Sequence, residues 1–287
     1  MNARLLFAIV VTLPNLAAAS PPGWNLVWHD EFNINGAPDP KKWDYEEGFE
    51  RNNESQYYTR DRRENARVEN GHLVIEARKE AITIERGGKP IPVQYTSASL
   101  ITRGRASWTY GRIEVRAKLP AGRGTWPAIW TLGEKIKTVG WPSCGEIDIM
   151  EFVGHDPDTV YFNVHTKGFN HTKGNGRGSK AKLPEAHTAF HTYMLDWSPE
   201  KLQFHLDGKP VFTCANDHTG PDSWPFDAPQ YLLLNLAIGG SWGAQKGIDD
   251  SLFPHRFLID YVRVYQKKKQ DAPPSQIFLA PRPAPPL

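Results

Sequence analysis

The chain has 287 residues, and its 34 lysines and arginines against 32 aspartates and glutamates give a formal net charge of +2. This length suits one large domain or two small ones, and a hydrophobic fraction of 39% with 11% aromatic residues is enough for a sizeable core. The small net charge argues against a nucleic-acid-binding protein, which usually presents a strongly basic face.

Residues 1–19 have the three parts of a secretory signal peptide. MNAR supplies a positive start, LLFAIVVTLPNL an apolar stretch, and AAA a small-residue cleavage site before Ser20. The apolar stretch is too short to cross a bilayer, which needs roughly 20 residues. We therefore expect a secreted or periplasmic protein that is cleaved near Ala19 and has no membrane anchor.

Two strands with clear periodicity are predicted in the first half of the chain. GHLVIEAR at 71–78 places Leu73 and Ile75 on one face, and GRIEVRAKLP at 111–120 alternates apolar and charged residues throughout. Alternation with a period of two is typical of a half-buried strand with one face in water.

The next stretch, TWPAIW, places Trp126, Ala128 and Trp130 on one strand face, two large rings with a small residue between them. Sugars present flat apolar faces, and an indole offers a large rigid apolar surface with a polar handle. This pattern indicates a carbohydrate-binding groove, to which Trp242 in the GGSWG segment would add a third ring. The alternative is that Trp126 and Trp130 belong to the core.

GEIDIMEF at 145–152 carries three acids on a stretch that otherwise reads as a buried strand. Glu146 and Asp148 share a face, but Glu151 has the opposite parity. One extra residue near Ile149–Met150, a β-bulge, would bring Glu151 to the face of the other acids and return Phe152 to the core. Bulges are frequent beside active sites, so the spacing predicts an inserted residue there.

Three acids on one face suit glycoside hydrolysis, which needs one protonated and one ionised carboxyl group on either side of a sugar. Like charges at close range move their pKa values apart, so that one group can stay protonated near neutral pH. Two alternatives remain at this point: a solvated strand face, or a site for a hard cation such as calcium.

Histidines and cysteines give no definite metal or redox site. HTKGFNH offers the pair His165 and His171, but no third ligand has a useful spacing. Cys144 and Cys214 either form one disulfide or are two buried free thiols, and the sequence leaves both open.

The second half of the chain predicts further strands. KLQFHLDGKPVF at 201–212 reads as a hairpin that turns at Asp207 and Gly208. YLLLNLAIGG at 231–240 is almost continuously apolar, which favours a central strand, and FLIDYVRVY at 257–265 is the last one. Residues 269–287 are proline-rich and predict a disordered tail.

Many short strands between glycine and proline signals, with no helical period over three turns, predict an all-β sandwich or barrel of antiparallel strands. We expect one domain over residues 20–268.

The acid motif resembles the signature of glycoside hydrolase family 16, in the laminarinase-like branch with Glu-x-Asp-x-x-Glu spacing. The resemblance covers nearly all of the mature chain. It includes LVWHDEF (26–32), NNESQYYT (52–59), VENGHLVIEA (68–77), YTSASLITRGRASWTYGRIEVRAKLPAGRGTWPAIW (95–130), LLLNLAIGGSWG (232–243) and IDYVRVYQ (259–266).

The resemblance implies a β-jelly-roll sandwich with a substrate cleft on its concave sheet, and a retaining endo-β-1,3-glucanase that needs no cofactor for catalysis. Glu146 would be the nucleophile, Glu151 the acid/base and Asp148 an assistant to the nucleophile. We expect a monomer whose partner is its β-glucan substrate.

Binding residues are also implied by the resemblance. Candidate sugar contacts are Trp126, Trp130, Trp242, Asn53, Arg103 and His165, the last with a purely structural strand histidine as its alternative. A structural calcium on the convex side would use the Asp260 carboxylate and the carbonyl groups of Glu31 and Gly71, whereas Asp260 could equally pair with an arginine.

Four rival activities share this fold: a mixed-linkage 1,3-1,4-glucanase, a galactan hydrolase, a transglycosylase and a non-catalytic glucan-binding protein. The last class typically lacks the catalytic acids, and both glutamates are present here. The bulged spacing favours laminarin-type substrates, because lichenase and xyloglucan branches usually show Glu-x-Asp-x-Glu.

Overall fold

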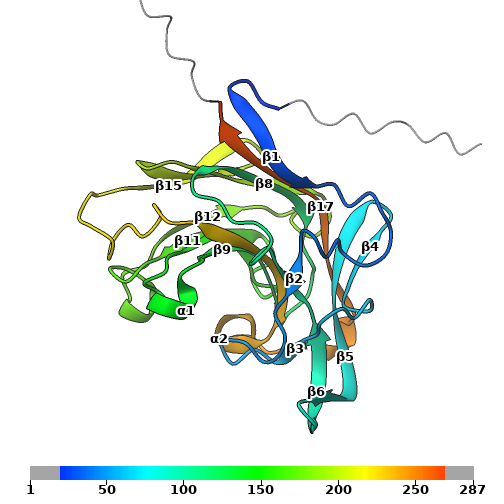
Figure 1. The fold of residues 1–287 in the computed structure, drawn as a ribbon. Helices are drawn as coiled ribbons and strands as arrows, with labels where there is room; N and C mark the ends of the chain where they lie inside the picture. Colours follow the sequence, from blue (N-terminus) through cyan, green and yellow to red (C-terminus); the bar gives the residue numbers. More distant parts are fainter. Residues whose placement is uncertain (1–19, 269–287) are drawn as a thin grey trace, which may run out of the picture.

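The computed structural model describes residues 20–268 and consists of two β-sheets packed face to face (Figure 1). The ten-stranded sheet contains, in spatial order, β15 (Lys209–Ala215), β14 (Lys201–Leu206), β13 (His191–Trp197), β8 (Gly111–Lys118), β17 (His255–Lys267), β5 (His72–Arg86), β6 (Lys89–Ser97) and β3 (Gln56–Tyr58), with β1 (Trp24–Asp30) beside β17 and β4 (Ala66–Glu69) beside β5.

The seven-stranded sheet contains, in spatial order, β12 (Arg177–Lys182), β11 (Thr159–His165), β10 (Glu146–Phe152), β9 (Thr125–Gly133), β16 (Gln230–Ile238), β7 (Ser99–Ile101) and β2 (Asp44–Tyr45). The helices are single turns, namely α1 (Ile136–Val139), α2 (Gly240–Gly243), η1 (His171–Lys173) and η2 (Asp250–Leu252). In Figure 1 the smaller sheet curves around one side of the molecule, where α1 and α2 lie. Within residues 20–268 no helix is long and apolar enough to cross a membrane.

The predicted all-β sandwich is confirmed, since the strand pairs are antiparallel except for β3 with β6. β8 alternates buried and half-buried residues along its whole length. β16 lies between β9 and β7 and is buried at all nine positions, as expected for an interior strand. β14 and β15 form the predicted hairpin, in which Asp207 and Gly208 both have positive φ angles (48° and 75°), as a two-residue turn of this type requires.

The core lies between the two sheets. Side chains from the inner face of the smaller sheet, such as Ile147 and Phe162, share one buried cluster with Val115, Leu195 and Phe204 of the larger sheet. The rings of Phe162 and Phe204 meet edge to face with centroids 6.1 Å apart. Burial of this apolar surface holds the sheets together and leaves the opposite, concave face of the smaller sheet for polar groups.

Both cysteines are free thiols and both are buried. Cys144 directly precedes the turn into β10, whereas Cys214 lies in β15 of the other sheet and belongs to the main core. The disulfide alternative is therefore wrong, and the alternative of two buried thiols is confirmed. The predicted signal peptide (1–19) and the proline-rich tail (269–287) lie outside the described residues.

Candidate active site

The predicted bulge is present in β10. Against β9, Asp148 lies opposite Trp130 and Met150 opposite Ile129, so Ile149 is the extra residue. Ile149 and Met150 both enter the core between the sheets. Two successive inward side chains reverse the parity of the strand, and this places Glu151 on the same face as Asp148.

The concave face is organised in rows, because residues opposite each other on neighbouring strands share a face. The three rows, written from β9 through β10 to β11, are Leu132–Glu146–His165, Trp130–Asp148–Asn163 and Ala128–Glu151–Tyr161. The three acids therefore form a line along β10, with indole and amide groups on its flanks.

Separate N–H donors hold the two glutamates. Glu151 accepts hydrogen bonds from Trp126 Nε1 (3.1 Å) and Asn163 Nδ2 (2.7 Å), one on each carboxylate oxygen. Glu146 Oε2 accepts one from Trp141 Nε1 at 3.0 Å. Both carboxyl groups are thus oriented from the side and keep their positions on the floor of the concave face.

Asp148 has a different environment. Its Oδ2 atom is buried and makes no hydrogen bond, and within residues 20–268 no hydrogen bond joins Asp148 to Glu146 or Glu151. His165 Nε2 is 3.4 Å from Asp148 Oδ2 and 3.8 Å from Glu146 Oε1. His165 therefore faces both Asp148 and Glu146.

Burial raises the pKa values of all three acids, and repulsion between carboxylates adds to this for Glu146 and Asp148. Burial and then the charge of Glu151 raise the pKa of Glu146 to about 8, against smaller opposing effects of Arg51 and Trp141. Burial and the two neighbouring glutamates raise the pKa of Asp148 well above its usual range. For Glu151, burial raises the pKa, although its two hydrogen bonds oppose this. Burial thus favours the protonated form of each carboxyl group over its form in water.

His165 lies in the line as the resemblance implied, but it is neutral there. It is 8% exposed, and burial together with the neighbouring His171 lowers its pKa to about 4. The ring centroids of His165 and His171 are 5.0 Å apart.

The three predicted tryptophans differ in exposure. Trp126 is half-buried, and its ring packs edge to face on Trp242, with centroids 5.6 Å apart. The Trp242 ring also packs edge to face on Tyr161, with ring centroids 4.8 Å apart. Trp130 is only 6% exposed, because its Nε1 donates to Asn235 at 2.7 Å and its ring belongs to a smaller buried cluster. Trp126 and Trp242 thus form the open aromatic surface, whereas Trp130 is mainly a buried support.

Two predicted polar contacts lie apart from the acids. Asn53 is exposed, and no described contact links it to them. Arg103 lies 5.4 Å above the ring of Tyr231 and within 4.0 Å of Glu134. Neither side chain touches the three carboxyl groups.

Trp141 and Arg51 were missed by the sequence reasoning. Trp141 lies between α1 and β10, is 38% exposed and bonds to Glu146. Arg51 pairs with Glu46, and its Cζ lies 5.0 Å from the Trp130 ring centroid. The only sequence signal for Trp141 is a tryptophan before a proline, five residues ahead of Glu146.

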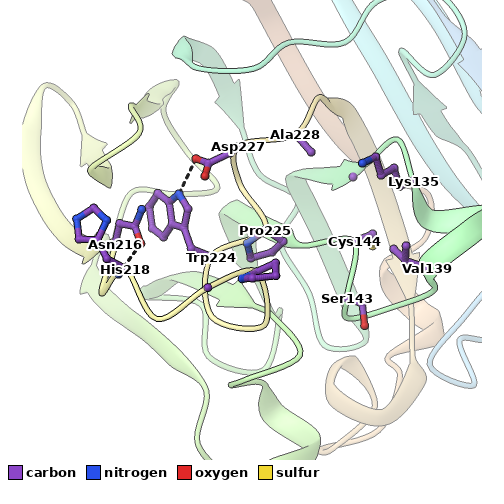
Figure 2. Close-up of a pocket in the computed structure, with 13 residues that line it drawn as sticks. Lys135, Val139, Ser143, Cys144, Asn216, His218, Trp224, Pro225, Asp227 and Ala228 are labelled. Carbon is purple, nitrogen blue, oxygen red and sulfur yellow. Dashed lines mark hydrogen bonds between the residues drawn. The ribbon is translucent and has the colours of Figure 1, made fainter.

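A pocket of about 560 Å³ is lined by the segment that precedes β10 and by residues between 216 and 228 (Figure 2). Its labelled lining residues are Lys135, Val139, Ser143, Cys144, Asn216, His218, Trp224, Pro225, Asp227 and Ala228. Trp224 Nε1 donates to Asp227 Oδ1 at 3.0 Å, which fixes one wall. The segment that carries Trp141 also supplies lining residues, namely Lys135, Val139, Ser143 and Cys144.

One of the predicted calcium ligands has another partner. The Asp260 carboxylate pairs with Arg116, so a cationic group already lies beside it. The side chain of Glu31 pairs with Arg263 at 2.7 Å, whereas its predicted ligand is the backbone carbonyl group, as at Gly71. The arginine alternative for Asp260 is therefore the one that the structure shows.

A row of carboxyl groups beside exposed indole rings, on one face of a β-sandwich, defines the glycoside-hydrolase class of protein. Comparison with known proteins agrees. The model of the family "Glycosyl hydrolases family 16" matches residues 53–272. The chain belongs to this family.

Similar proteins include a β-glucanase of Rhodothermus marinus, 51% identical over 255 residues, which covers 85% of this chain and 86% of the relative. The solved structure of the laminarinase from Rhodothermus marinus matches with a TM-score of 0.79 and 49% identity, covering 86% of this chain and 98% of that one. SCLam, a non-specific endo-β-1,3(4)-glucanase, matches with a TM-score of 0.81 and 49% identity, covering 86% and 93%.

Proposed function

We propose that the protein cleaves internal β-1,3-glucosidic bonds of β-glucans with retention of configuration. The observation that carries this proposal is the bulge in β10, which aligns Glu146 and Glu151 on one face with Asp148 between them. Retaining enzymes need two carboxyl groups, about 5–5.5 Å apart, that flank the scissile bond. The similarity to a laminarinase supports the choice of β-1,3-glucan.

The environments of the acids support a nucleophile at Glu146 and an acid/base at Glu151. Burial and the two neighbouring glutamates raise the pKa of Asp148 well above its usual range, which favours its neutral form and limits the negative charge beside Glu146. Glu146 and Glu151 then share one proton, because two adjacent buried carboxylates repel each other. The productive form has Glu146 ionised, with Trp141 donating to it, and the proton on Glu151.

In the first step the Glu146 carboxylate attacks the anomeric carbon, the glycosidic C–O bond breaks, and the Glu151 proton moves to the leaving oxygen. In the second step the Glu151 carboxylate takes a proton from water, and that water displaces Glu146 from the sugar. Asn163 and Trp126 stabilise the Glu151 carboxylate that exists between the two steps, because each donates to it.

The test is a time course of products from laminarin, lichenan, xyloglucan and agarose. We expect mixed oligosaccharides to appear early from laminarin, with the β-anomer formed first in NMR spectra. Glucose as the sole early product would refute internal cutting, and a first-formed α-anomer would refute retention.

A mixed-linkage β-1,3-1,4-glucanase is the second candidate, because the chain is also 49% identical to a non-specific endo-β-1,3(4)-glucanase. Release of oligosaccharides from lichenan at a rate similar to that from laminarin would favour it. Activity on agarose alone would favour a galactan hydrolase, and longer products would indicate a transglycosylase. Binding of laminarin without cleavage would indicate a non-catalytic glucan-binding protein.

We also propose export of the mature protein as a monomer that begins at Ser20. Export and the cleavage point rest on the sequence of residues 1–19, whereas the monomer is an expectation from the family resemblance. N-terminal sequencing of the exported protein and its mass in solution test both points. A calcium ion at Asp260 stays a prediction that requires Arg116 to move, and an unchanged melting temperature after calcium addition would refute it.

A further inference from the structure

Three potential metal-ligating atoms converge at one end of the acid row. Glu146, Asp148 and His165 each present one such atom, and these atoms all lie within 4.8 Å of one another. Within the described residues no other group of three acids, histidines or cysteines is this close. The ligands come from two neighbouring strands, so His165 meets acids that lie 17 and 19 positions away in the sequence, and His171 is not a member of the group.

One atom in this group is uncommitted. Asp148 is 3% exposed, and its Oδ2 atom has no hydrogen bond although it lies 3.4 Å from His165 Nε2. The His165 side chain is also buried, at 8% exposed. Buried polar atoms without a partner are costly, so a ligand that supplied a partner would be bound favourably.

The spacing of the atoms suits a small transition-metal ion. Two ligands each about 2.1 Å from a tetrahedral ion lie about 3.4 Å apart. The distance from His165 Nε2 to Asp148 Oδ2 is 3.4 Å, and that to Glu146 Oε1 is 3.8 Å. One imidazole with two carboxylates suits zinc or copper, whereas calcium prefers six to eight oxygen ligands.

We propose that Glu146, Asp148 and His165 form a binding site for a zinc-like divalent transition metal, which inhibits the protein by competing with the polysaccharide. The ion takes the carboxylate of Glu146, so this group is no longer available to attack a sugar. A fourth position stays open to water. The inhibitory consequence rests on the proposed role of Glu146, whereas binding of the ion does not.

Binding is tested by titrating ZnCl2 into the purified protein in a calorimeter, with Co²⁺ absorption as the spectroscopic measure of four-coordination. We expect one ion per chain. His165→Gln should weaken the affinity by about tenfold or more, because one of three protein ligands is lost. His218→Gln is the matched control, since this exposed histidine lies elsewhere, at the rim of the pocket.

Unchanged zinc affinity in His165→Gln would overturn the proposal, as would loss of binding in His218→Gln. If His165→Gln does not show the native near-ultraviolet circular dichroism, Asp148→Asn takes its place with the same expected loss. The kinetic experiment is separate: zinc should raise the apparent KM for laminarin and leave kcat unchanged. Tight binding in a protein that cleaves no polysaccharide would retain the metal site and refute the proposed function.

Discussion

Buried carboxyl groups on the two sheets have pKa values that are shifted in opposite directions. Glu76 in β5 is 1% exposed and pairs with Arg67 (2.9 Å), Arg256 (3.0 Å) and Arg78. Burial raises its pKa, but the arginines outweigh this effect, with Arg67 first, and the pKa is lowered. On β10, burial acts on Glu146 without a cation bonded to it, and the pKa is raised to about 8.

The comparison shows that burial alone does not decide the charge of an acid. A carboxylate surrounded by guanidinium groups is fixed in its ionised form and stabilises the fold, whereas a carboxyl group left among other acids can exchange protons. The larger sheet therefore carries a structural acid, and the concave sheet carries acids that suit catalysis.

The largest expected effect is on activity. Glu146→Gln removes the proposed nucleophile and should lower kcat on laminarin by about a thousandfold or more, since no other group forms the glycosyl-enzyme. Circular dichroism should remain native. Hydrolysis at an undiminished rate would show that the nucleophile is another residue.

The matched change on the larger sheet, Glu76→Gln, should lower stability and leave activity unchanged. Glu76→Gln leaves three arginines without their shared carboxylate and should cost about 2–3 kcal/mol of unfolding free energy, somewhat below a fully buried pair because the arginines are partly exposed. The kcat on laminarin at 25 °C should stay near that of the native protein. Urea unfolding and initial rates measure the two quantities. A Glu76→Gln variant that is stable but inactive would contradict the assignment of a structural role to Glu76.

The hydrogen bonds to Glu151 can be tested next. Asn163→Ala removes a donor that favours the ionised form, so the pKa of Glu151 should rise. The limb of the pH–rate profile that reports the acid should move to higher pH by up to about one unit, and kcat should fall about tenfold. A profile that moves to lower pH would contradict the role of Asn163.

The smallest effect concerns stability against pH. The pKa of Glu146 is about 8 in the folded protein and 4.5 without the fold, so between these values the folded state binds more protons than the unfolded state. The native protein should therefore lose stability as pH rises from about 5 to 8, and Glu146→Gln should lose less. At pH 8 the melting temperature of Glu146→Gln should be higher by about 2–4 °C. Equal melting temperatures across this range would show that Glu146 titrates normally.

Periodic features were predictable from sequence, and contacts between distant segments were not. Asp148 and Glu151 are three residues apart, and in a strand one inserted residue is enough to place both on the same face. The bulge could therefore be predicted. The bond between Trp141 and Glu146 depends on an irregular loop, which no periodicity describes. The meeting of His165 with Asp148 depends on the register between β10 and β11.

The same limit applies to charged pairs. Asp260 had two equally plausible partners in the sequence, and only the position of Arg116 on the neighbouring strand decides between them. The cysteines likewise required coordinates, because Cys144 lies in the turn before β10 and Cys214 in β15, segments that the sequence does not place relative to each other. The fold class and the acid row were therefore predictable from periodicity, whereas the contacts around the row were not.

The extra residue in β10 has a consequence for how this scaffold changes its substrate. A strand without Ile149 would present the same acids, in the same order and on the same side, because regular alternation then places all three together. Gain or loss of that position is thus neutral for the bond-breaking groups. Linkage preference has to arise from the surrounding walls, which makes the segment bearing Trp141 a better target for redesign than the acids themselves.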